Sequence, residues 1–137
     1  MLVHANIIRN VLPVASIYNI LIIDDEPILL DLLADMLDPH MCTKADSFED
    51  ACTHMTTGLF DVVICDLMMP KISGLELYSY TVSHFPQLQN RFVFITGGMC
   101  DIQLEQQLEE TKQMVLFKPF TIAHLQKTVE QVVQKSA

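Results

Sequence analysis

Carboxylate, hydroxyl and amine side chains follow four short apolar runs of this sequence. Asp24 and Asp25 come directly after one run, and Asp66 comes after another. Thr96 and Lys118 follow two later runs. Carboxylates bind hard divalent cations, and they also attack phosphoryl groups. A hydroxyl and an amine can hold the charged oxygens of a phosphoryl group in transfer. These residue types therefore indicate metal-assisted phosphoryl transfer, with one carboxylate as the nucleophile.

Each of these residues has an ordinary explanation when it is considered alone. An Asp after a strand is usually a turn residue or a helix cap, and Asp24 and Asp25 are both suited to cap the helix that follows. Lys118 before a proline is compatible with a surface lysine, and Thr96 before two glycines with a turn. The order Asp-Asp, Asp, Thr, Lys after separate apolar runs is much harder to explain in this way, so the combination favours a functional site.

Five short apolar runs predict the strands that position these residues: 20–23, 41–45, 62–65, 92–95 and 114–117. Four of them are almost continuously apolar, which is typical of parallel strands that helices cover on both faces. Helical patterns lie between them and begin near Pro27, Ser47, Ser73, Asp101 and Thr121. Strand alternating with helix five times predicts an α/β protein with a doubly wound parallel sheet, (βα)5. Right-handed crossovers favour the strand order 2-1-3-4-5.

Apolar residues at helical spacing predict which helix faces pack on the sheet. The predicted core face of the first helix carries Leu29, Leu32, Leu33 and Met36. Two further apolar residues flank that face: Ile28 and Leu30. They are suited either to exposure, where a phosphotransfer partner would dock, or to extra packing in the core. The predicted core face of the last helix carries Ile122, Leu125, Val129 and Val132.

The carboxyl ends of the strands determine where the candidate residues meet. In an open parallel sheet, ligands bind beyond these ends at the point where the strand order reverses, and strands one and three are neighbours there. Asp24, Asp25 and Asp66 are therefore expected to converge. Thr96 and Lys118 close the same pocket from its other side. Three close carboxylates repel one another, so at least one pKa should rise unless a cation such as Mg²⁺ neutralises them.

Composition and charge restrict the remaining functions. The 137 residues fit one domain, and no window is apolar enough to span a membrane. The net charge of -9 argues against direct binding to nucleic acid, because phosphate would be repelled. The four cysteines lack C-x-x-C spacing, which favours reduced thiols and a cytoplasmic location over a metal site or a disulfide framework. They are Cys42, Cys52, Cys65 and Cys100.

Four motifs give the chain a resemblance to the receiver domains of two-component signalling. They are IIDDEP at 22–27, CDLMMPKISG at 65–74, ITG at 95–97 and FKPF at 117–120. The resemblance extends over residues 19–133 and implies a flavodoxin-like receiver fold. It also implies a place in a His-Asp phosphorelay, with a histidine kinase or a histidine phosphotransfer protein as the partner. The domain itself would then catalyse phosphoryl transfer from phosphohistidine to its own Asp, and the later hydrolysis.

Matched position by position, the resemblance implies a role for each acidic residue. Asp66 corresponds to the phosphoacceptor. Asp25 and Asp66 correspond to direct ligands of Mg²⁺, for which Mn²⁺ can substitute, together with the backbone carbonyl of Met68. Asp24 corresponds to a ligand that acts through a bound water.

The resemblance also covers the opposite side of the pocket. Thr96 corresponds to the switch hydroxyl that moves toward the phosphoryl group, and Lys118 to the cation that pairs with it. A cis bond between Lys118 and Pro119 is implied as well, and Gly97 leaves room for the phosphoryl group. Val115 stands where the family often has an aromatic switch residue, so the usual paired movement lacks its second partner.

The parent protein stays open at this stage. Residues 1–18 are expected to be an N-terminal extension or linker, and residues 19–137 the receiver domain. Residues 12–15, LPVA, resemble the closing strand of a kinase ATP-binding domain. This favours the receiver of a hybrid sensor histidine kinase over a stand-alone receiver. A pseudo-receiver, which binds partners without phosphorylation, is the alternative function, and a homodimer is left open.

Overall fold

A five-stranded parallel sheet forms the centre of the computed structural model, which describes residues 16–98 and 101–136. Its strands are β1 (Asn19–Ile23), β2 (Met41–Ala45), β3 (Val62–Asp66), β4 (Phe92–Thr96) and β5 (Met114–Phe117). They lie in the order β2-β1-β3-β4-β5, and every neighbouring pair is parallel. The predicted strands, their order and the α/β class are confirmed.

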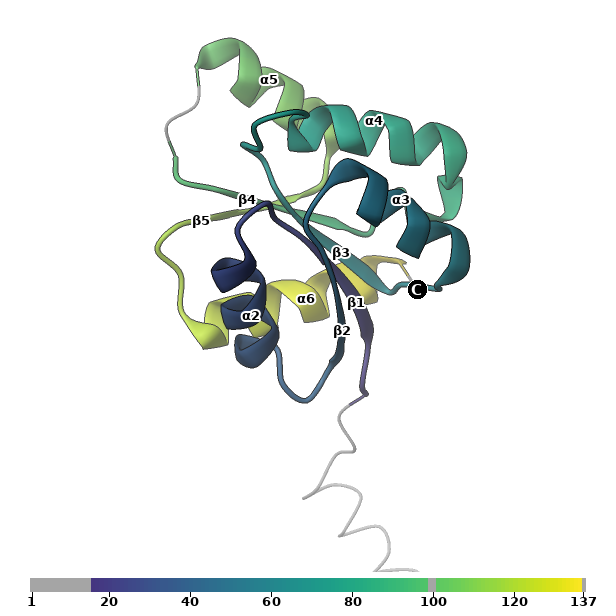
Figure 1. The fold of residues 1–137 in the computed structure, drawn as a ribbon. Coiled ribbons are helices and arrows are strands. Elements are labelled where there is room, and N and C mark those ends of the chain that lie inside the picture. Colours follow the sequence, from purple (N-terminus) through teal and green to yellow (C-terminus); the bar gives the residue numbers. More distant parts are fainter. Residues whose placement is uncertain (1–15, 99–100, 137) are drawn as a thin grey trace, which may run out of the picture.

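Helices cover both faces of this sheet (Figure 1). α2 (Pro27–Met36) and α6 (Ile122–Ser136) lie on one face, and α3 (Phe48–Thr57), α4 (Gly74–His84) and α5 (Ile102–Thr111) lie on the other. A short 3₁₀ turn, η1 (Pro86–Leu88), follows α4. Successive side chains of a strand point to opposite faces. β1 therefore contributes Ile20 and Ile22 to one core cluster, and Leu21 and Ile23 to the other.

Side-chain caps fix where four of the helices begin, among them α6, which the Thr121 hydroxyl caps. The Ser47 hydroxyl accepts a hydrogen bond from the backbone N–H of Asp50 at 3.1 Å. Ser73 caps α4 in the same way, and the carboxylate of Asp101 caps α5. Each cap satisfies an N–H group that has no partner inside the helix. These contacts explain why the predicted helix starts are confirmed.

The buried face of α2 differs from the predicted one. Leu30 is 4% exposed and Leu33 is also buried, whereas Leu32 is 51% exposed. Leu30, Leu33 and the following Leu37 recur at i, i+3 and i+7, which is the face turned to the sheet. The prediction failed because apolar residues fill most of the first two turns, so the spacing alone fits more than one face. Of the two flanking residues, Ile28 is 80% exposed, as a docking role requires, whereas Leu30 is part of the core and is not exposed.

α6 packs on the sheet through three of its four predicted core residues. Leu125, Val129 and Val132 are buried, in agreement with the prediction. Ile122 is exposed instead. It is the first residue of the helix and stands one turn before Leu125, the first buried residue of α6.

Tyr18, directly before β1, connects the start of that strand to His40, directly before β2, and to α6. Its ring is buried and stacks on His40, with ring centroids 5.0 Å apart. Its hydroxyl donates a hydrogen bond to Glu130 of α6 at 2.7 Å. Tyr18 thus packs with the domain, although the sequence-based boundary leaves it in the extension. Residues 1–15 of that extension, including the LPVA run at 12–15, lie outside the described residues.

No helix within 16–98 and 101–136 is long and apolar enough to cross a membrane. Cys42, Cys52 and Cys65 carry free thiols, and Cys100 lies outside the described part of the chain.

Candidate functional site

Three aspartate side chains meet at the carboxyl edge of the sheet. β1 and β3 are paired in register with Ile23 opposite Cys65, so the residues that follow emerge side by side. One carboxylate oxygen each from Asp24, Asp25 and Asp66 lies within 4.8 Å of the others. The predicted convergence of these carboxylates is confirmed. Oxygen donors at this spacing suit a hard divalent cation such as Mg²⁺.

Burial raises the pKa of the carboxyl groups of Asp24 and Asp66. Asp24 is only 3% exposed, and its burial raises the pKa of its carboxyl group to about 6. The backbone N–H of Glu26, which donates to Asp24 Oδ1 at 2.9 Å, opposes that rise in pKa, and the charge of Asp66 adds to it. Burial is likewise the main cause that raises the pKa of Asp66. The predicted rise is confirmed, but loss of solvent outweighs repulsion between the carboxylates as its cause.

The loop after β3 holds Asp66 through its backbone. Asp66 Oδ1 accepts a hydrogen bond from the N–H of Met68 at 3.3 Å, which orients the carboxylate. The side chain of Met68 is exposed, so it does not cover the cluster. The backbone of this loop, rather than its side chains, therefore shapes the acceptor side of the pocket.

Gly74 allows α4 to begin directly behind the acceptor strand. Its N–H donates to the carbonyl of Leu67 at 2.8 Å. A Cβ atom at this position would lie 2.7 Å from the carbonyl oxygen of Asp66, which is closer than packed atoms approach. Sequence reasoning placed Gly74 in a motif but gave it no role. The available signal was a glycine at the first position of a helix, directly after the Ser73 cap. Only the structure shows how closely this glycine approaches the carbonyl oxygen of Asp66.

Thr96 and Lys118 stand at the ends of the two strands beyond β3. Thr96 lies opposite Phe117 in the register of β4 and β5, and its carbonyl accepts a hydrogen bond from the N–H of Lys118 at 2.8 Å. Thr96 is buried, and its hydroxyl accepts a hydrogen bond from the N–H of Gly98 at 3.4 Å. The charge of Lys118 lowers the pKa of both Asp24 and Asp66, so its ammonium acts on the same cluster.

Two smaller features that the resemblance implies are also present on this side. The bond between Lys118 and Pro119 is cis. A Cβ atom at Gly97 would meet no heavy atom within 4 Å, so the space beside this glycine is open. Val115 lies opposite Phe94 and is partly buried against the core, where it fills the position that an aromatic residue often takes.

Comparison with known proteins gives the class of this chain. The family described as the response regulator receiver domain matches residues 20–130, and the chain belongs to this family. It is a receiver domain of two-component signalling.

Among curated proteins, the chain is similar to the sensor histidine kinase RcsC of Salmonella typhi, with 30% identity over 114 residues. The alignment covers 80% of this chain but only 12% of that kinase, so the chain spans about an eighth of its relative. Two solved structures share the fold. Chemotaxis protein CheY4 of Vibrio cholerae has a TM-score of 0.76 and 21% identity, over 85% of this chain and 99% of that one. NtrX from Brucella abortus has a TM-score of 0.78 and 22% identity, over 88% and 28%.

Proposed function

We propose that this receiver domain accepts a phosphoryl group on Asp66 in a Mg²⁺-dependent reaction and thereby switches its contacts with other proteins. The observation that carries the proposal is the convergence of Asp24, Asp25 and Asp66 within 4.8 Å at the carboxyl edge of the sheet. Thr96 and Lys118 emerge at the ends of the next two strands. A pseudo-receiver binds its partners without phosphorylation, so it would not need these five side chains in one place.

In this proposal, Asp66 is the nucleophile. One of its carboxylate oxygens forms a bond to phosphorus while the bond between phosphorus and the donor imidazole nitrogen breaks, and the imidazole keeps the electron pair of that bond. The N–H of Met68 holds Oδ1 of Asp66 and so leaves the other oxygen to attack. The Lys118 ammonium pairs with one oxygen of the arriving group, and the Thr96 hydroxyl donates to another.

The acidic side of the pocket would hold the metal. Asp25 and Asp66 are proposed as direct ligands with the carbonyl of Met68, and Asp24 as a ligand through water. Mg²⁺, or Mn²⁺ in its place, supplies positive charge that neutralises the carboxylates and the phosphoryl oxygens. The donor set fits this role because it is made of oxygens and because burial leaves Asp24 and Asp66 poorly solvated.

A partner that carries phosphohistidine is part of the same proposal. Three exposed apolar side chains come shortly after site residues in the chain, namely Ile28 on α2, Met68 after β3 and Ile122 on α6, and we infer that they border the acidic cluster. Such a border suits a flat helical surface that brings an imidazole to Asp66 and excludes water around it. We therefore propose a histidine kinase or a histidine phosphotransfer protein as the donor, without direct contact to nucleic acid.

The similarity to RcsC supports a wider context. We propose that the domain works as the receiver of a hybrid sensor histidine kinase, in the cytoplasm, and a stand-alone receiver is the second candidate. We also propose that the domain can form a homodimer, because receivers act through contacts with other proteins.

The chemistry can be tested with a donor that contains the same phosphorus–nitrogen bond. We would incubate the full chain with phosphoramidate and Mg²⁺ and record its intact mass. The proposal predicts a gain of one phosphoryl group that is lost in base, as an acyl phosphate is. A gain that survives base would instead indicate a hydroxyl acceptor, and no gain with any phosphorus–nitrogen donor, protein or small molecule, would favour the pseudo-receiver.

A further inference from the structure

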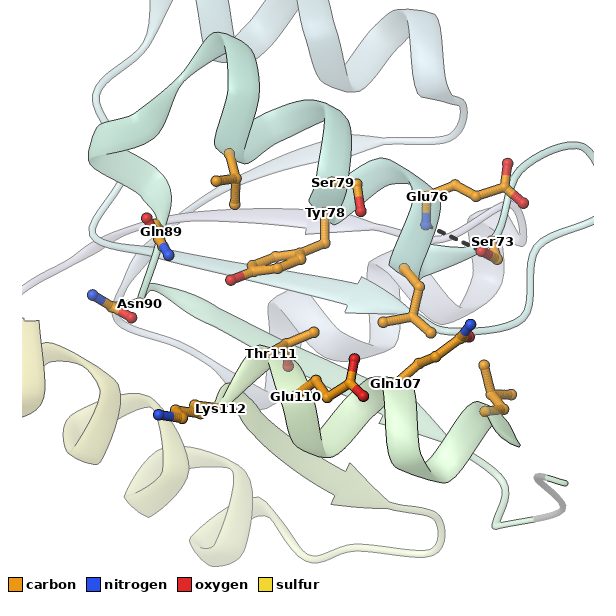
Figure 2. A pocket seen from close by; sticks show the side chains of 13 residues that line it. Ser73, Glu76, Tyr78, Ser79, Gln89, Asn90, Gln107, Glu110, Thr111 and Lys112 are labelled. Carbon is orange, nitrogen blue, oxygen red and sulfur yellow. Dashed lines mark hydrogen bonds between the residues drawn. The ribbon is translucent and has the colours of Figure 1, made fainter. Parts of the chain in front are cut away.

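A groove separates α4 from α5 on the face of the sheet opposite α2 and α6 (Figure 2). Its volume is about 890 Å³, and it runs beside both helices. Figure 2 shows Glu76 on the α4 side, and Gln107 and Glu110 on the α5 side. The ring of Tyr78 lies between the two walls. The groove does not include any of the three aspartates of the metal site.

α5 is the least firmly packed α-helix in the described part of the chain. It buries Leu108 fully and Leu104 partly. Each of the other α-helices among the described residues buries at least two side chains. Most helical stability in proteins comes from the packing of an apolar face. The groove side of α5 is therefore a surface on which a further apolar contact would stabilise the helix.

Neutral polar residues make up much of the lining of this groove, together with three aliphatic side chains, which we call its floor, and two glutamates, which we call its walls. Leu75, Val82 and Leu104 line it, and all three are only partly buried against the core. Glu76 and Glu110 are exposed on opposite walls. The lining residues include one basic side chain, Lys112, at the end of the groove near β5.

The surroundings extend this negative charge. Four of the residues from 101 to 111 are acidic and none is basic, and the whole chain carries a net charge of -9. A second copy of this chain would bring the same negative charge to the groove and be repelled. An occupant with an apolar face and basic side chains matches both the floor and the walls.

We propose that this groove binds a cationic amphipathic segment of another protein. Its aliphatic side chains would pack on the floor of Leu75, Val82 and Leu104, and its Lys or Arg side chains would lie beside Glu76 and Glu110. α4 has 11 residues, so about three helical turns fit along it at roughly 1.5 Å per residue. The proposal goes beyond the proposed function and does not depend on phosphorylation of Asp66.

The test uses the full chain and three synthetic helical peptides, each with a fluorescent label. The first has leucines at i, i+3, i+4 and i+7 and lysines elsewhere. In the second, glutamates replace the lysines. In the third, glutamines replace the leucines. Fluorescence anisotropy at low ionic strength should show that the first peptide binds at least about tenfold more tightly than either control.

Two double variants with the same change in net charge locate the contact. Glu76→Gln with Glu110→Gln removes both acidic walls of the groove and should weaken binding of the lysine peptide about fivefold, as for two exposed ion pairs. Glu105→Gln with Glu109→Gln removes two exposed acidic residues of α5 that do not line the groove. That pair should change the affinity less than about twofold.

Several outcomes would overturn the assignment. Equal loss of affinity in the two double variants would mean that the peptide follows net charge rather than the groove. Equal binding of the glutamate peptide would show that positive charge does not select the occupant. Equal binding of the peptide without leucines would show that apolar contacts do not contribute. A homodimer of the chain that the lysine peptide dissociates would assign the groove to a second copy instead.

Discussion

Replacing Asp24 with Asn should stabilise the metal-free domain at neutral pH. Asp24 is buried, and its pKa of about 6 lies above the ordinary value of 3.8. The folded state therefore binds the proton of Asp24 more tightly than the unfolded state does. The stabilisation from protonated Asp24 is fully present below pH 3.8 and is lost as the pH rises through about 6. At neutral pH the buried carboxylate is charged and costs stability.

The size of this cost follows from the pKa values. A rise from 3.8 to about 6 is roughly two pH units, which corresponds to about 3 kcal/mol at 1.36 kcal/mol per unit. The cluster opens to solvent through the exposed Asp25, which screens the interaction, so about 2 kcal/mol is expected. Asn keeps an oxygen for the N–H of Glu26 and removes only the charge. Asp35→Asn, an exposed carboxylate on α2, is the matched control and should change stability by less than about 0.5 kcal/mol.

Urea unfolding, followed by circular dichroism with a chelator present, measures this difference. Asp24→Asn should raise the free energy of unfolding near pH 7.5, and its advantage over the wild type should disappear near pH 4. Added Mg²⁺ should stabilise the wild type, because it binds the folded state alone, and should stabilise the variant less. If Asp24→Asn instead lowers stability at pH 7.5, or keeps its advantage at pH 4, the burial of a charged Asp24 is not the cause.

Four further substitutions test other features of the fold and the site. Gly74→Ala should destabilise the domain by about 1 to 3 kcal/mol in urea unfolding, since the new Cβ meets the carbonyl oxygen of Asp66. An unchanged midpoint would show that this turn has room. Leu30→Ala should cost about 2 to 4 kcal/mol and Leu32→Ala less than about 1, by the same assay, because only Leu30 is buried. Equal losses of stability in the two variants would favour the face predicted from the sequence, in which Leu32 is buried. Lys118→Met should raise the pKa of Asp66, measured by carboxyl NMR, and a lowered pKa would contradict the assignment of its charge.

The sheet was predictable because its strands are buried on both faces. Val62 to Cys65 and Phe92 to Ile95 are continuous apolar runs, which are typical of parallel strands covered on both faces. Because Asp66 and Thr96 end two neighbouring parallel strands, the strand order places both residues at the same edge of the sheet. The same argument is weaker for a helix such as α2, where apolar residues surround the axis and packing selects the face.

The finer properties of the site depend on distances that a sequence does not contain. The high pKa of Asp24 arises mainly from its burial, and neighbouring carboxylates in the sequence do not reveal that. The contact of Gly74 with the carbonyl of Asp66 depends on how closely α4 approaches β3. The groove beside α5 is likewise a result of how two helices are spaced. Local patterns place residues at a strand end, whereas solvent exposure and helix spacing arise from packing.

The most direct test of the central claim is to identify the residue that takes up the phosphoryl group. We would compare intact masses after incubation with acetyl phosphate, with Mg²⁺ or with a chelator, for the wild type, Asp66→Asn and Asp61→Asn. Asp61 is the matched control because it lies at the opposite end of β3. The account predicts one added phosphoryl group in the wild type and in Asp61→Asn, only with Mg²⁺, and none in Asp66→Asn. A phosphoryl group on Asp66→Asn, or one that forms equally without a divalent cation, would contradict it.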